Sequence, residues 1–343
     1  MLPLCGDLAA GRMSGILRGK KGAPMYWNDL SSHLKAVYGT KVYKLSLSSG
    51  CTCPNRDGTL DSRGCIFCDG AGTFAAAGDI RQQLAAAKAR VAAKAGPNAR
   101  YIAYFQSFTN TYGPVDRLRQ LYTAALEPEE VAALSIATRP DCLGPEVLEL
   151  LAELREKKPV WVELGLQTIH PASAAYIRRG YDLPVFDAAV KQLKAIGVRV
   201  IVHQILGLPG ETPEMMAQTS RYIGQAGADG VKLHLLHVLR NTDLAAEWQA
   251  GRVQTLELPE YIAALELCLR NLPPEVVIHR LTGDGAKRDL LSPLWSGDKK
   301  RVLNAIRRAF ERDDLVQGSA LSAACKWQRL LPGTYLQKTA AEP

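Results

Sequence analysis

Residues 49–68 read SGCTCPNRDGTLDSRGCIFC and directly follow a strand-like run at 41–48. Cys53, Cys65 and Cys68 give this glycine-containing loop the spacing C-x11-C-x2-C. Three thiolates in one loop can hold three corners of an iron–sulfur cube and leave the fourth iron open to another ligand. The loop therefore indicates an iron–sulfur cluster at the end of the first strand of an alternating strand–helix chain.

Cys51 leaves a second interpretation open, because a structural zinc ion takes four closed protein ligands. Cys51 and Cys53 would then act with Cys65 and Cys68 as a C-x-C…C-x-x-C site. Zinc ribbons usually set two C-x2-4-C pairs on facing knuckles, and C-x-C is a poor knuckle. A zinc-binding protein that interacts with nucleic acid without catalysis is thus the alternative to an iron–sulfur protein.

The composition describes an ordinary globular protein with a sizeable core. The 343 residues, 47% of them hydrophobic, suffice for one barrel-sized domain with an appendage. The sequence contains no run of about 18 apolar residues that could span a membrane. The N-terminus also lacks the continuous apolar stretch of a secretory signal. We therefore expect a cytoplasmic protein without a membrane partner, in which clustered, reduced cysteines favour metal binding over disulfides.

The net charge of +8 includes basic clusters at 299–301 and 307–308. Such clusters can contact the phosphates of a nucleic acid. A solvated helix face is the simpler interpretation, and charge alone decides little between the two.

From about residue 41 onward, short strand-like runs alternate with helix-like runs. The expected strands are 41–48, 100–106, 132–138, 159–167, 198–206 and 230–238, and the expected helices are 79–95, 115–125, 145–157, 172–178, 185–196 and 213–226. This alternation implies parallel strands joined by right-handed crossovers. Six such units are compatible with an open sheet and with a partial barrel.

Alternation within the strands favours the barrel. Val162, Leu164 and Leu166 form an apolar face that would pack on helices, whereas Glu163 and Gln167 share the opposite face near the strand's carboxyl end. Barrel enzymes keep their active sites at that end. The same alternation predicts that five further side chains face the barrel interior: Ser135, Ala137, Arg139, Lys232 and His234. Polar groups on inward faces predict a ligand-filled channel, with a packed core of paired polar residues as the alternative.

The chain resembles the radical S-adenosylmethionine (SAM) superfamily, and within it the YhcC/YtqA-like family, which is similar to the radical domain of the elongator Elp3 proteins. The resemblance covers about residues 25–315 and is carried by the segments Lys41–Leu45, Cys53–Gly58, Gly64–Cys68, Tyr104–Tyr112, Gly207–Thr212 and His279–Asp284. It implies an α/β fold, a partial (β/α)6 radical SAM barrel with a small C-terminal α/β cap. We expect a disordered N-terminal extension at 1–24, the barrel core at 25–240, the cap at 241–320 and a tail at 321–343.

The expected cap contains a helical run at 259–271, a strand-like run at 276–279 and a basic helix at 297–311. In the family this region covers the open side of the barrel. Residues of the His279–Asp284 segment would there either face the substrate or form interdomain hydrogen bonds.

The resemblance also assigns roles to single residues of the cysteine loop. Cys53, Cys65 and Cys68 match the superfamily's three cluster ligands, with a first gap of eleven residues, as in Elp3-like members. Cys51 stands where relatives usually carry an aromatic residue, so it is not an expected ligand. Phe67 matches the aromatic position that packs near the SAM adenine.

Further cofactor contacts follow from the same resemblance. Gln106 and Ser107 occupy the strand end where relatives bind the methionyl amino group, although the usual Gly-Gly-Glu is lacking. Gln167 and Arg179 match SAM-binding positions of coproporphyrinogen-dehydrogenase-like relatives, and His203 stands where those relatives carry an aspartate ligand. The loop 207–212 is expected to line the cofactor. The expected cofactor-binding residues are therefore Phe67, Gln106, Ser107, Glu163, Gln167, Arg179 and His203.

The function implied is that of a radical SAM enzyme. A [4Fe-4S] cluster would cleave S-adenosyl-L-methionine reductively to methionine and a 5′-deoxyadenosyl radical, which abstracts a substrate hydrogen. The substrate would be tRNA, by the Elp3-like resemblance, or a small molecule. A flavodoxin- or ferredoxin-like electron donor is the expected partner, and a non-catalytic iron–sulfur scaffold is a further alternative.

Overall fold

The computed structural model describes residues 26–70, 75–283 and 287–321. The extension expected at 1–24, nearly all of the tail expected at 321–343 and Asp284 lie outside the described residues. Within the described part of the chain, no helix is long and apolar enough to cross a membrane.

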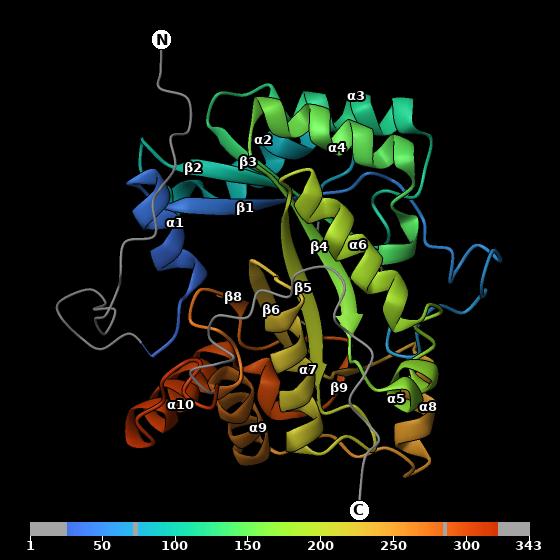
Figure 1. Ribbon diagram of the computed structural model, residues 1–343, viewed down its shortest axis with the longest axis vertical. Helices are drawn as coiled ribbons and strands as arrows, with labels where there is room; N and C mark the ends of the chain where they lie inside the picture. The colour runs from blue at the N-terminus through green and yellow to red at the C-terminus, as the bar shows by residue number, and fades with distance from the viewer. Residues whose placement is uncertain (1–25, 71–74, 284–286, 322–343) are drawn as a thin grey trace, which may run out of the picture.

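The centre of the molecule is a curved, fully parallel sheet of seven strands (Figure 1). Its order is β1 (Val42–Leu47), β2 (Arg100–Phe105), β3 (Val131–Thr138), β4 (Val160–Gln167), β5 (Arg199–Leu206), β6 (Gly230–Leu235) and β8 (Val277–Arg280). The six expected strands are present in the expected order, so the partial barrel is confirmed. The seventh strand, β8, comes from the segment expected in the cap and pairs with β6.

The crossover helices cover the outer face of the sheet (Figure 1). They are α2 (Ile80–Val91), α3 (Val115–Leu126), α4 (Pro145–Lys157), α5 (Pro171–Tyr176), α6 (Leu183–Ala195) and α7 (Pro213–Gln225). Local sequence fixes their starts: Asp79 and Gln82 form a capping box before α2, and the Thr212 hydroxyl caps α7 ahead of Pro213. The helix expected at 79–95 is α2 followed by a 3-10 turn, η2 (Ala92–Lys94).

The remaining elements flank this sheet. They are α1 (Leu30–Tyr38), η3 (Pro140–Cys142), α8 (Asp243–Gln249), α9 (Leu258–Arg270), η4 (Leu294–Gly297), α10 (Lys299–Arg312) and the antiparallel pair β7 (Val238–Leu239) and β9 (Leu290–Ser292). The helices expected at 259–271 and 297–311 are therefore α9 and α10.

The two faces of β4 differ as the alternation predicted. Val162, Leu164 and Leu166 are fully buried in the main core between the sheet and its helices. Trp161 faces the barrel interior, where it packs in a small apolar cluster with Leu34, Ile102, Ala133 and Ile201. We call this cluster, which fills the amino-terminal end of the barrel, the apolar plug.

The segment before β1 connects the two edges of the open barrel. The Asn28 carbonyl accepts the N–H of Ile278 in β8 at 2.8 Å, and Asp29 forms a parallel bridge with the same residue. The following helix, α1, contacts both β1 and β8. One short segment thus contacts both edge strands of the sheet, β1 and β8, which are far apart in the sequence.

Candidate active site

A cavity of about 230 Å³ opens at the carboxyl ends of the strands. Eight of the ten residues that the sequence assigned to a cofactor site line it: Cys53, Cys65, Phe67, Cys68, Glu163, Gln167, Arg179 and His203. They come from the cysteine loop, β4, β5 and the segment after α5. The fold thus brings together residues spread over 150 positions of sequence (53 to 203).

The cysteine loop is shaped by its own backbone and by Arg56. The N–H of Cys68 bonds to the carbonyl of Cys65 at 2.9 Å, and Arg56 donates to the Cys68 carbonyl. Gly64 and Gly70 have φ of +78° and +66°. A Cβ at either position would lie within 3 Å of the flexible end of the Arg56 side chain, so the positive φ is the stronger reason for glycine.

The middle of the loop is anchored to a second core cluster. The N–H of Ile66 bonds to the Ile177 carbonyl at 3.3 Å, and the Ile66 carbonyl accepts the N–H of Leu244 at 3.0 Å. The Ile66 side chain packs with Ile177, Ile205 and Leu244. The loop is therefore held by contacts outside the cavity, which leaves its thiols on the cavity wall.

The chemistry of the thiols fits a metal cluster. Burial raises the pKa of Cys65 to about 11, so a thiolate there requires a cation beside it. The Asn55 amide approaches the Cys65 sulfur at 3.5 Å and is fixed by a 2.8 Å bond to the Arg178 carbonyl. Among the described residues, no three His, Cys, Asp or Glu side chains are close enough to hold a single metal ion. Three thiols on the wall of one cavity are compatible with three corners of an iron–sulfur cube.

Cys51 lies apart from the other three cysteines. It is buried in the main core and does not line the cavity. A Cβ at Gly113 would touch its sulfur at 3.4 Å, which shows how closely the chain surrounds it. Cys51 is therefore not among the thiols on the cavity wall.

Arg179 lines the cavity, but its guanidinium bonds to the main chain. It donates to the carbonyls of Leu166 at 3.2 Å, Thr168 at 2.7 Å and Tyr181 at 3.0 Å. These bonds hold the chain where it leaves β4, at Gln167, whose φ is +68°. Arg179 thus shapes the cavity wall beside Gln167.

Gln106 and Ser107 lie at the end of β2 but do not line the cavity. The Gln106 amide donates to the Ser46 hydroxyl at 3.0 Å, and the Ser107 carbonyl accepts from Asn110 at 3.0 Å. The next residue, Phe108, lines the cavity instead, with a φ of +62°. The loop 207–212 also lies outside the lining, where Gly207 packs against Leu256.

Sequence reasoning gave no cofactor role to Arg139 and Tyr181, which also line the cavity. Arg139 forms a two-point ion pair with Asp141 at 2.9 and 2.7 Å, and donates to the Arg179 carbonyl at 2.9 Å. The Tyr181 ring lies against both guanidinium groups, 5.2 and 4.6 Å from its centroid. Arg139 was detectable, because it continues the inward-facing positions of β3, whereas nothing in the sequence marks Tyr181.

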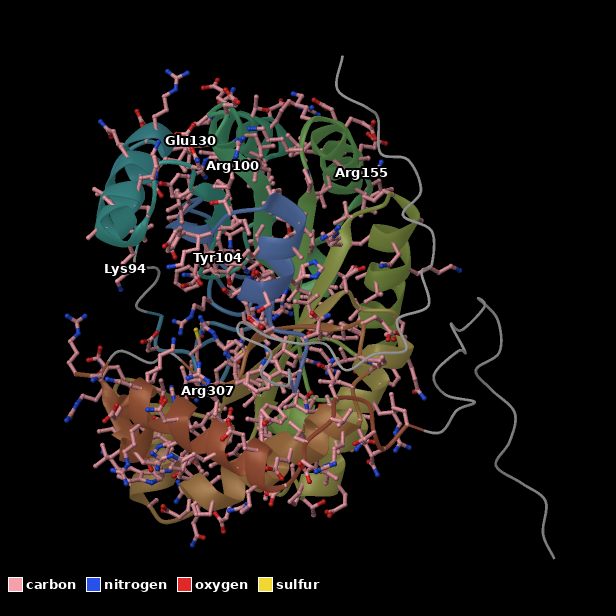
Figure 2. The ribbon with its side chains drawn as sticks, turned by 90° about the vertical axis from the view of Figure 1, so that its left-hand side faces the viewer. Lys94, Arg100, Tyr104, Glu130, Arg155 and Arg307 are labelled. Carbon is pink, nitrogen blue, oxygen red and sulfur yellow. The ribbon has the colours of Figure 1, made fainter. Side chains whose placement is uncertain are left out.

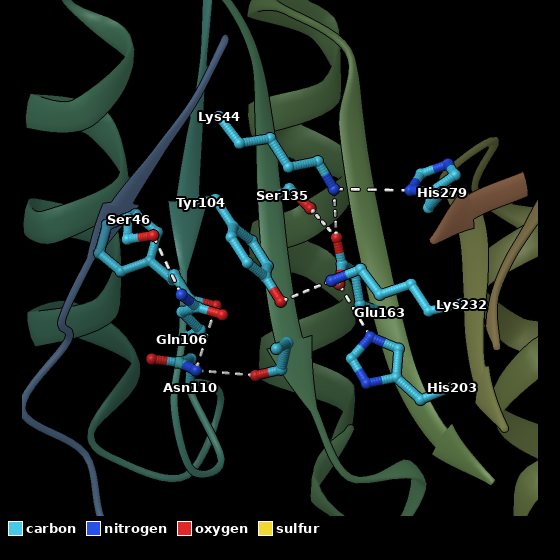
Figure 3. A network of polar contacts seen from close by, with 12 residues as sticks. Lys44, Ser46, Tyr104, Gln106, Asn110, Ser135, Glu163, His203, Lys232 and His279 are labelled. Atoms are coloured by element: carbon cyan, nitrogen blue, oxygen red, sulfur yellow. Dashed lines mark hydrogen bonds and ion pairs between the residues drawn. The ribbon is translucent and has the colours of Figure 1, made fainter. Parts of the chain in front are cut away.

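Glu163 receives four hydrogen bonds from the barrel interior (Figure 3). One oxygen accepts from Lys44 at 2.7 Å and Ser135 at 2.8 Å. The other accepts from His203 Nε2 at 2.9 Å and from Lys232. Burial raises the pKa of Glu163, but the two lysines outweigh it and hold that pKa well below its usual value.

His203 beside it is neutral. Burial, with Lys232 nearby, lowers the pKa of His203 to about 4. Because Nε2–H donates to Glu163, Nδ1 is left as a hydrogen-bond acceptor. The position that the resemblance assigned to a cofactor contact therefore carries a group that can accept a hydrogen bond.

Comparison with known proteins agrees with this geometry. The radical SAM superfamily model matches residues 53–223, and the radical SAM C-terminal domain matches residues 228–312. The chain therefore belongs to the radical SAM superfamily, whose members typically use a [4Fe-4S] cluster and SAM. Over nearly its whole length it is similar to YtqA of Bacillus subtilis, at 40% identity, covering 85% of this chain and 92% of that protein. YhcC of Escherichia coli K12 is 37% identical, covering 86% and 95%.

More distant similarity extends to elongator-type proteins. The tRNA uridine(34) acetyltransferase of Methanocaldococcus jannaschii is 28% identical, over 44% of this chain and 28% of that protein. The solved structure of Methanocaldococcus infernus Elp3 superposes with a TM-score of 0.64 at 18% identity, covering 80% of this chain and 64% of that one. The latter similarity supports the fold alone.

Proposed function

We propose that this protein is a radical SAM enzyme in which Cys53, Cys65 and Cys68 bind a [4Fe-4S] cluster and the adjoining cavity binds SAM. The observation that carries the proposal is that all three thiols line one cavity with Phe67 and His203. When bound, the cluster and SAM supply a 5′-deoxyadenosyl radical, formed with methionine, that removes a hydrogen atom from the substrate.

The residues of the chain bind and orient these groups. The three thiolates would hold the cluster and leave one iron without a protein ligand, available to the amino acid end of SAM. Phe67 offers an apolar surface for the adenine, and His203 Nδ1 offers an acceptor to a hydroxyl or amino donor. Arg179 holds the wall at Gln167 through its bonds to main-chain carbonyls.

The chemistry needs one electron from outside the chain. We propose a flavodoxin- or ferredoxin-like protein as the donor, because both classes carry single electrons at low potential. Dithionite replaces this partner in the first assay.

The decisive test is anaerobic reconstitution with iron and sulfide, reduction with dithionite, addition of SAM and measurement of 5′-deoxyadenosine. We expect a brown protein that forms 5′-deoxyadenosine, loses this activity as Cys53→Ala and keeps it as Cys51→Ala. Equal losses in both variants would overturn the ligand assignment. A colourless, zinc-loaded protein would favour the zinc-binding alternative, and a brown protein inert toward SAM would favour a non-catalytic scaffold.

A second proposal concerns the substrate, for which α10 favours RNA. Its apolar side, including Val302, Ile306 and Phe310, is buried. Its other side exposes Lys300, Arg301, Arg307 and Arg308, and none of these four forms an ion pair with the described residues. Arg307 lies in the half of the molecule away from Glu130 (Figure 2).

An exposed cationic face with a buried apolar back suits a phosphate backbone rather than a membrane. The tRNA acetyltransferases among the relatives point the same way. We expect tRNA affinity to fall steeply with salt, and the double variant Arg307→Gln/Arg308→Gln to reduce the slope by about 2, close to one unit per lost phosphate contact. A slope unchanged by the double variant would remove α10 from the interface.

A further inference from the structure

Six strands of the barrel each contribute one inward-facing polar side chain to a network around Glu163 (Figure 3). We call this layer the polar floor; it consists of Lys44 (β1), Tyr104 (β2), Ser135 (β3), Glu163 (β4), His203 (β5) and Lys232 (β6). The apolar plug lies on one side of the floor. On the other side Glu163 and His203 line the cavity, so the floor forms the inner end of that cavity.

The polar floor holds more basic than acidic side chains, although burial lowers the pKa of Lys232 to about 7. Lys44 and Lys232 both bond to Glu163, the one carboxylate of the layer. Arg280, from β8, is near enough to act electrostatically on Tyr104, His203 and Lys232. The neighbouring histidines do not add to the charge or offset it, because burial lowers the pKa of His203, His234 and His279.

The two ammonium groups also have hydrogen-bonding capacity left. Each has three N–H donors. Within the described residues, Lys44 contacts the Glu163 carboxylate and His279 Nδ1, the latter at 3.5 Å. Lys232 contacts Glu163 and the Tyr104 hydroxyl, the latter at 2.8 Å. Each ammonium also lies over the Tyr104 ring, 4.8 Å from its centroid for Lys44 and 4.4 Å for Lys232. Each lysine keeps one N–H for which the described residues supply no hydrogen-bond acceptor, and both lysines lie on the same carboxylate.

We propose that the polar floor binds an oxyanion group of the substrate, a carboxylate or a phosphate, through Lys44 and Lys232. The assignment of this anion to the substrate rests on the proposed function, whereas anion binding itself does not.

Charge balance favours this role over a purely structural one. A buried ion pair adds little stability compared with apolar side chains of the same volume, and excess buried charge is costly without a counterion. The side chain of Lys44 is 20% exposed and that of Lys232 only 5%, so a ligand would reach the polar floor at Lys44. A ligand oxyanion would supply both the missing negative charge and acceptors for the free N–H donors.

Ligand-observed NMR on the full chain, with inorganic phosphate and with acetate as separate probes, tests the proposal. We expect saturable binding of at least one probe, weakened about tenfold by Lys44→Met, as for the loss of one charge-assisted hydrogen bond. Lys44→Arg keeps the charge and should bind within about threefold of the wild type. Lys191→Met, an exposed lysine on α6, is the matched control and should bind as the wild type does.

Three results would overturn the proposal. They are no saturable binding of either probe, equal losses in Lys44→Met and Lys191→Met, and displacement of the probe by S-adenosylhomocysteine in reconstituted protein, which would assign the anion site to the cofactor. The double variant Lys232→Met/Glu163→Gln removes one basic and one acidic side chain and should also lose binding, which guards against a folding defect specific to Lys44→Met. Preference between the probes distinguishes a phosphate from a carboxylate substrate. Anion binding with no 5′-deoxyadenosine formation would refute the radical chemistry but not the anion site.

Discussion

The apolar plug and the polar floor are consecutive inward-facing layers of the same strands. Ile102, Ala133, Trp161 and Ile201 belong to the plug, and the residue two positions later on each strand belongs to the floor. Two residues along a strand correspond to about 6–7 Å. One such step changes the barrel interior from a sealed apolar contact to a charged surface facing the cavity. The position of a residue along its strand therefore decides whether its inward-facing side chain belongs to the apolar plug or to the polar floor.

Among the substitutions considered, the largest loss of activity is expected at the thiols on the cavity wall. Cys65→Ala should reduce 5′-deoxyadenosine formation to the background of cluster-free protein, because a cube held by two thiolates has lost a protein ligand. Unfolding of the metal-free protein should hardly change. Parallel measurements of iron content, product formation and thermal unfolding check this. Retained activity would refute Cys65 as a ligand.

Substitution in the apolar plug should lower stability and leave the activity of the folded protein unchanged. Trp161 is nearly fully buried, so Trp161→Ala should lower the free energy of unfolding by about 3–5 kcal/mol through the cavity it leaves. The protein that remains folded should still bind iron and form 5′-deoxyadenosine. Denaturant titration measures the first effect and the reconstituted assay the second. Lost cleavage in folded protein would mean that the plug does more than fill space.

Substitution in the floor should combine a stability loss with a change in charge. Glu163→Gln leaves Lys44 and Lys232 without their carboxylate, and we expect a loss of about 3 kcal/mol in the free energy of unfolding. The matched control is Glu153→Gln, which breaks the exposed pair with Arg119 and should cost less than about 1 kcal/mol. Similar losses in the two variants would show that the floor is no more than an ordinary ion pair.

The smallest effect concerns pH. The pKa of His203 is lowered to about 4 in the folded protein, so the unfolded chain binds a proton first as the pH falls through about 6.5. Stability should therefore decrease between about pH 6.5 and pH 4, and His203→Asn should reduce this decrease by about 1–3 kcal/mol. Urea unfolding at several pH values measures it. The plug contains no titratable group, so an equal change in Ala133→Gly would contradict the assignment.

The sequence was sufficient for features that depend on local periodicity. Alternation along β4 correctly separated Val162, Leu164 and Leu166 from Glu163, and the same rule placed Ser135 and Lys232 inside. Resemblance supplied the cysteine ligands as a prediction, and the fold brings them to one cavity. The inward and outward positions of the strands require only knowledge of which face of a strand is apolar.

Features that depend on closure of the barrel were missed. Lys44 reaches Glu163 across 119 positions of sequence, and no local pattern marks this contact. The strand β8 is four residues long and follows a helical segment, so its place in the sheet became evident only from its pairing with β6. Gln106 and Ser107 were expected in the site, but the backbone turn after β2 brings Phe108 to the cavity instead.

The hydrogen bond between Asn28 and Ile278 has a consequence for assembly of the chain. Edge strands with free N–H and carbonyl groups invite pairing with other molecules, and β8 is the last strand of the barrel to be synthesised. Its outer edge is covered by a segment made some 250 residues earlier (28 to 278). That segment also bonds to Gln317, through Asn28 and Tyr26. The outer edge of β8 can therefore be covered only after both the first and the last described segments of the chain have been synthesised. Closure of the sheet is thus a late, non-local step of folding.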